Sequence, residues 1–80
     1  MSGFEYEILF ALNDQDTDKL INLTGITKEE AKKYEESYSK NKEKIFSAKK
    51  AGENSSLFET RQLDIIYEIS DKAISNNHAK

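Results

Sequence analysis

Helix caps are the main signals for where secondary structure begins and ends in this chain, because it contains no proline and only three glycines, at positions 3, 25 and 52. In a capping box a serine or threonine is followed three residues later by a glutamate. Three such pairs are present: Ser2 with Glu5, Thr27 with Glu30, and Ser56 with Glu59. Asp16 or Thr17 can cap a further short segment that ends at Gly25. The chain is therefore expected to be a series of helices.

The apolar periodicity predicts an all-α fold, a single small domain of residues 1–80 with helices near 3–12, 17–24, 28–50 and 57–75. The third helix has a seam of residues spaced three and four apart: Ala31, Tyr34, Tyr38, Asn41, Ile45 and Ala48. The fourth has an apolar stripe: Phe58, Ile65, Ile66, Ile69 and Ala73. Leu63, Tyr67 and Ile74 widen this stripe, so the fourth helix is expected to pack on two sides. A seam this short favours an intramolecular antiparallel hairpin over a dimeric coil. Residues 76–80 are expected to form a frayed polar tail.

Two segments leave an alternative open. Apolar residues also alternate along 3–12 with the period of a half-buried strand: Phe4, Tyr6, Ile8, Phe10 and Leu12. Helix is favoured there because of the capping box and because a lone strand would have no partner. Within the third helix, Ser37, Ser39 and Asn41 are poor helix formers. The sequence therefore allows a break in the third helix.

Composition argues against an enzyme. The chain has no cysteine, so it can form no disulfide and no thiolate metal site. Its one histidine, His78, lies in the expected frayed tail, where it is not expected to assemble a triad or a multi-histidine metal site. No glycine-rich phosphate loop is present. Asp14, Asp16 and Asp18 are spaced like the start of a calcium loop, but its glycine and terminal glutamate are missing, so helix capping is favoured. We expect no catalytic residues, no cofactor and no metal.

The charge balance and the N-terminal residues give expectations about location. The formal net charge of −3 recommends neither nucleic acid nor an anionic membrane as a partner of the whole surface. Residues 1–12 have Glu5 and Glu7 where a secretory signal would carry basic residues, and a small domain without cysteine suits a reducing compartment. We therefore expect a cytoplasmic protein with no membrane partner. The excess of lysine over arginine hints at an A/T-rich phage or plasmid source.

Residues 20–34, LINLTGITKEEAKKY, resemble a helix-turn-helix. In that motif a left-handed glycine ends the first helix, an apolar residue follows, and a hydroxyl caps the second helix. Gly25, Ile26 and Thr27 match these positions in order, and Ala31 and Tyr34 match the residues that pack back. The resemblance covers about 17–37, and about 4–38 once the preceding helix is included.

The resemblance implies a DNA-binding transcription regulator whose second motif helix faces duplex DNA through Thr27, Lys28, Glu29, Lys32 and Lys33. The lysines would contact phosphates, and the threonine the backbone or a base edge. Residues 27–50 carry a net charge of +3, whereas 1–26 carry −4 and 51–80 carry −2. Against this interpretation, two glutamate–lysine pairs spaced four apart on the same helix can neutralise this face: Glu29 with Lys33, and Glu36 with Lys40.

The alternative is a helical protein-binding module without DNA binding, such as an inhibitor, an antitoxin-like antagonist or an assembly adaptor. Eight aromatic residues are more than a thin four-helix core readily hides. Tyr34, Tyr38 and Phe46 are the predicted partner-binding residues. A core this lean also gains stability from a second copy, so we expect a weak homodimer through the aromatic and heptad surface.

Overall fold

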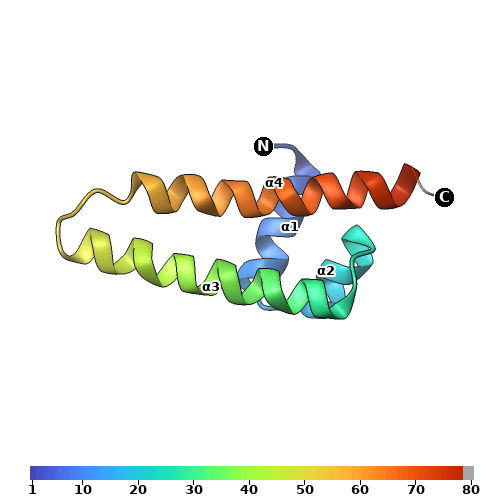
Figure 1. Cartoon of the computed structure of the whole chain (residues 1–80), viewed down its shortest axis with the longest axis horizontal. Helices are drawn as coiled ribbons and strands as arrows, with labels where there is room; N and C mark the ends of the chain where they lie inside the picture. Colours follow the sequence, from blue (N-terminus) through green and yellow to red (C-terminus); the bar gives the residue numbers. More distant parts are fainter. Residues whose placement is uncertain (79–80) are drawn as a thin grey trace.

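The computed structural model describes residues 1–78, which form an all-α fold. Its helices are α1 (Gly3–Asn13), α2 (Thr17–Thr24), α3 (Lys28–Lys50) and α4 (Ser56–His78). The two long helices, α3 and α4, lie antiparallel as a hairpin, and α1 crosses them while α2 lies near the N-terminal end of α3 (Figure 1). The molecule measures 47 × 20 × 17 Å. The predicted fold class and hairpin are thus confirmed.

The first segment is a helix, so the strand alternative for residues 3–12 is wrong. Ser2 Oγ accepts from the backbone N–H of Glu5 at 3.3 Å, and the Ser2 N–H donates to Glu5 Oε1 at 2.6 Å. Ile8 is fully buried, whereas Tyr6 and Phe10 are 46% and 48% exposed. Residues four apart share a helix face. Ile8 and Leu12 therefore lie on the buried face of this helix, and Tyr6 and Phe10 lie on its exposed face.

The third helix continues without a break through Ser37–Asn41. Its seam lies against α4, and Asn41 Nδ2 donates to the carbonyl oxygen of Phe58 at 2.6 Å. Packing and this hydrogen bond outweigh the low helix propensity of these residues, as is usual in proteins. Because this seam packs against α4 within the chain, it is not exposed as a dimer surface, and self-association of the chain stays a prediction.

Both ends of α4 differ from the sequence expectation. At its start the expected box of Ser56 with Glu59 is absent: Ser55 precedes the helix and its hydroxyl donates to Glu59 Oε1 at 3.1 Å. The Ser56 N–H donates instead to Asn54 Oδ1 at 2.8 Å. At its end the helix continues to His78, three residues beyond the expected end at residue 75. The rest of the expected tail, residues 79–80, lies outside the described residues.

The core lies where α1 and α2 cover the hairpin. Its largest fully buried side chains come from all four helices: Ile8, Leu12, Leu20, Tyr38, Ile66 and Ile69. The Tyr38 hydroxyl donates to Asn13 Oδ1 at 3.0 Å and accepts from Gln62 Nε2 at 2.7 Å. This chain of hydrogen bonds joins α1, α3 and α4, and burial raises the pKa of the Tyr38 phenol.

Within residues 1–78 no helix combines the length and apolar character needed to cross a bilayer.

Candidate functional site

The connection between α2 and α3 has the local geometry that the sequence predicts. Gly25 has a φ of +72°, and its N–H donates to the carbonyl oxygen of Ile21 at 2.8 Å, which closes the end of α2. Ile26 is 3% exposed and packs into the core. Thr27 Oγ1 then accepts from the backbone N–H of Glu30 at 3.1 Å and begins α3. Three residues therefore turn the chain from one helix into the next.

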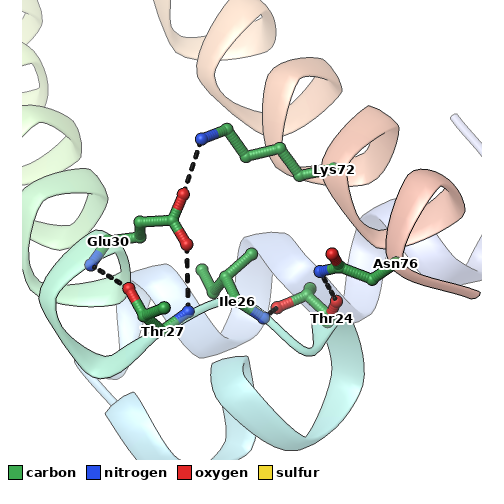
Figure 2. Close-up of polar contacts among 6 residues, drawn as sticks. All are labelled: Thr24, Ile26, Thr27, Glu30, Lys72 and Asn76. Carbon is green, nitrogen blue, oxygen red and sulfur yellow. Dashed lines mark hydrogen bonds and ion pairs between the residues drawn. The ribbon is translucent and has the colours of Figure 1, made fainter. Parts of the chain in front are cut away.

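Hydrogen bonds hold this turn from within and from α4 (Figure 2). The buried Thr24 hydroxyl donates to the carbonyl oxygen of Leu20 at 2.6 Å and accepts from the Ile26 N–H at 3.4 Å. Asn76 Nδ2 donates to the carbonyl oxygen of Thr24 at 3.0 Å. The last turn of a helix leaves carbonyl groups without partners inside the helix. Here the side chain of a distant helix satisfies one of them.

An ion pair fastens the first turn of α3 to α4 (Figure 2). Glu30 Oε1 accepts from the Thr27 N–H at 3.0 Å, and Glu30 Oε2 contacts Lys72 Nζ at 2.7 Å. Lys72 Nζ also lies 5.6 Å from the ring centroid of Tyr34. The hydrogen bond from Lys72, followed by that from the Thr27 backbone, lowers the pKa of Glu30 to about 2. The N-terminus of α3 is thus held by two charged groups 42 residues apart in the chain.

The pKa of Glu30 gives a pH prediction. In the folded chain it is lowered from 4.5 to about 2, so the stabilisation from its charge is fully present above pH 4.5 and is lost as the pH falls to about 2. We expect the difference in melting temperature between the natural chain and Glu30→Gln to shrink across this window. Thermal unfolding followed by circular dichroism between pH 2 and pH 6 measures it. A difference that stays constant with pH would contradict the assigned pairing.

The predicted DNA-facing residues lie together on one exposed side of α3. Lys28, Glu29, Lys32 and Lys33 are all exposed, and with Glu36 they line one shallow depression. Thr27 is exposed at the start of the same helix, and although its oxygen accepts the capping hydrogen bond, its hydroxyl hydrogen can still be donated. The structure therefore brings four of the five predicted residues to one surface, and Thr27 lies exposed at the start of the same helix.

Acidic groups border this cationic face and limit its reach. Glu36 pairs with Lys40 at 2.9 Å, one of the two neutralising pairs expected from the sequence. Gln15 and Lys32 line one depression, so the loop that carries Asp14 and Asp16 adjoins α3. Asp16 Oδ1 caps α2 by accepting from the Lys19 N–H at 3.1 Å, as predicted. The positive surface is consequently confined to the outer side of the first two and a half turns of α3.

Sequence reasoning missed the residues that hold α3 in place. Glu35 is only 9% exposed, and its Oε1 accepts from Thr17 Oγ1 at 2.9 Å, which joins the starts of α2 and α3. Glu35 follows the buried Ala31 by four residues, and this spacing alone could have placed it on the inner side. Lys72 and Asn76 carried no comparable signal, because their partners are distant in the chain.

The expected partner-binding aromatic residues do not share one surface. Tyr38 is 2% exposed and belongs to the core, so its assignment as a partner-binding residue is wrong. Tyr34 is half-buried against the core beside Lys72. Phe46 is 69% exposed on the loop-side half of the hairpin. Of the three, Phe46 alone presents most of its side chain to solvent.

Comparison of the chain with models of protein families, with curated proteins and with solved structures gave no match. Function is therefore inferred from the residues and their geometry.

Proposed function

We propose that this chain is a non-catalytic regulatory protein that binds duplex DNA with the exposed N-terminal half of α3. The observation that carries the proposal is the single exposed side shared by Lys28, Lys32 and Lys33, directly after a turn held by Gly25. Lys28 and Lys32 are about one turn apart, and Lys33 lies about 100° further around the helix, so the lysines flank the exposed side on which Glu29 and Glu36 lie. Lysines that flank a helix face suit phosphates on the two rims of a groove that the helix enters.

Each side chain on this face has a role that its chemistry allows. The three lysines contact phosphate oxygens, which gives affinity without sequence preference. Glu29 accepts a hydrogen bond from the exocyclic amino group of a cytosine, and Thr27 donates to a phosphate or a base edge. The glutamates on this face also weaken nonspecific binding to the DNA backbone, so the affinity for DNA depends on a favourable base contact at Glu29.

The contacts from α4 support the proposal because they fix the direction of α3. Glu30 and Thr24 are each bonded to α4, at 2.7 and 3.0 Å, on either side of the turn. A helix end that is already ordered loses less conformational entropy when it binds. The N-terminal end of α3, which carries the proposed DNA-binding residues, is therefore held in position before DNA binds.

The salt dependence of binding is the first test. If three lysines neutralise three phosphates, the logarithm of the binding constant should fall with the logarithm of salt concentration with a slope of about −2.7. Each change among Lys28→Ala, Lys32→Ala and Lys33→Ala should reduce that slope by about 0.9. Fluorescence anisotropy with a duplex selected from a random library, at several salt concentrations, measures both quantities.

Lys50→Ala is the matched control, because Lys50 is exposed on the same helix about 25 Å beyond Lys33. It removes the same charge and should leave the slope unchanged. Glu29→Ala should change the sequence selected from the library and not the slope. Equal effects of Lys50→Ala and Lys32→Ala would show that binding is diffuse and would contradict a reading face on α3.

A second candidate function, binding of a protein partner without DNA, is favoured by two large apolar side chains. Phe46 is 69% and Leu57 84% exposed, near the loop end of the hairpin. Recovery of one stoichiometric protein partner, together with no duplex affinity at low salt, would favour this function and reject DNA binding. A pull-down from the native host, analysed for both protein and DNA, separates the two candidates.

A further inference from the structure

An apolar hollow lies where α1 crosses the hairpin, and we call it the α1 step. The half of the hairpin nearest its loop extends beyond α1 (Figure 1). At the junction a surface hollow of about 380 Å³ is lined by five apolar residues and three polar ones: Met1, Leu9, Ile45, Leu63 and Ile66, with Lys49, Glu59 and Gln62. Met1 and Leu63 are 46% and 41% exposed, so the hollow leaves apolar area open to solvent.

An aromatic ridge stands beside this hollow on α1. The rings of Tyr6 and Phe10 stack with their centroids 6.4 Å apart, and each residue is close to half exposed. Leu9, which lines the hollow, is three residues from Tyr6 and is therefore its neighbour on the helix surface, so the ridge borders the hollow along α1. A projecting apolar ridge therefore borders an apolar hollow on the same surface.

We infer that the α1 step is the interface between two copies of this chain, in which the Tyr6–Phe10 ridge of each copy enters the hollow of the other. A two-fold dimer uses the same patch on both subunits, so the patch must be complementary to itself. A ridge adjoining a hollow of matching polarity meets that requirement, because the rotation that brings one ridge to one hollow brings the second pair together as well.

The charges at the margin of the step also suit a second copy. Lys49 Nζ and Glu59 Oε1 lie 3.3 Å apart there, and both side chains are more than half exposed. Because these opposite charges are paired within one chain, the margin has no net charge at this point. It therefore adds no local repulsion between two subunits of net charge −3.

The exposed area indicates a weak dimer. Half-exposed aromatic side chains each offer about 100 Å² of surface, so the ridge with Met1 and Leu63 offers up to about 400 Å² per subunit. The total of about 800 Å² lies below the size of stable specific interfaces, so we expect weak association, with a dissociation constant of about 10 μM to 1 mM. The step is about 25 Å along α3 from Lys28, so this inference is independent of the proposed DNA binding.

Sedimentation equilibrium on the full chain between about 10 μM and 2 mM is the test, because it spans the expected dissociation constants. The natural chain should pass from monomer to dimer, and Phe10→Glu or Leu63→Glu should weaken the association at least about 30-fold. Phe46→Glu is the matched control, since it replaces an exposed aromatic residue outside the step and should leave association unchanged. Circular dichroism of each variant reports whether it is folded.

Cross-linking tests the same interface without a destabilising charge. The natural chain has no cysteine, so a single cysteine can be introduced as a unique reporter. Under oxidation, a mixture of Phe10→Cys and Leu63→Cys chains should form mixed disulfides at least about tenfold faster than Phe46→Cys forms them with either. A monomer at 2 mM would overturn the inference. So would a dimer that is indifferent to both glutamate variants, or capture of a different protein by a step that does not self-associate.

Discussion

Ile69→Ala is expected to unfold a large share of the protein at 25 °C. Ile69 is fully buried in the core cluster, and truncating a buried isoleucine to alanine costs about 2–5 kcal/mol. A domain of this size without disulfides has a free energy of unfolding of about 3–5 kcal/mol, so little would remain. Urea unfolding followed by far-ultraviolet circular dichroism measures the loss.

Ile74→Ala is the control for this change. It makes the same substitution in the same helix, but Ile74 is 51% exposed, so a loss within about 0.5 kcal/mol is expected. The sequence placed Leu63, Tyr67 and Ile74 on a widened apolar stripe packed on two sides. All three are exposed, which corrects that expectation, and equal losses for Ile69→Ala and Ile74→Ala would contradict the burial described for α4.

Local signals in the sequence were sufficient to predict the bounds of α2 and α3. Both helices begin at a side-chain cap, at Asp16 and Thr27, and α2 ends at a glycine, so their limits depend on residues a few positions away. The C-terminus of α4 has no such local signal. It continues past the expected end, where Asn76 hydrogen-bonds to Thr24, a residue 52 positions earlier.

The same distinction applies to the candidate site. Its exposed lysines follow from one helix and one cap, and they lie where the sequence predicts. The assignment of Tyr38 to a partner failed because a seam residue has the same spacing whether its seam contacts α4 or another chain. The Glu30–Lys72 pair could not be predicted, because it depends on how two helices are aligned rather than on either sequence alone.

Gly25→Val is expected to destabilise the protein by about 2–3 kcal/mol and to weaken duplex binding. A β-branched residue is strained at a φ of +72°, and a Cβ at this position would lie 3.4 Å from Asn76 Nδ2. The Cβ alone makes an ordinary van der Waals contact there, but the methyl groups of valine extend beyond it. We therefore expect the substitution to strain the turn and to displace the Asn76 side chain that joins it to α4. Urea unfolding measures the stability, and duplex affinity measured under conditions in which the variant is folded reports the direction of α3.

Gly52→Val separates backbone strain from the effect on the turn. Gly52 has the same φ of +72°, but it lies in the hairpin loop and its Cβ would meet nothing within 4 Å. Its replacement should cost about 1–2 kcal/mol and leave the affinity of the folded protein for DNA unchanged. Gly25→Asn should retain most of both properties, because asparagine tolerates the left-handed region. If Gly25→Val and Gly52→Val lowered affinity equally, the turn before α3 would not position a DNA-binding face.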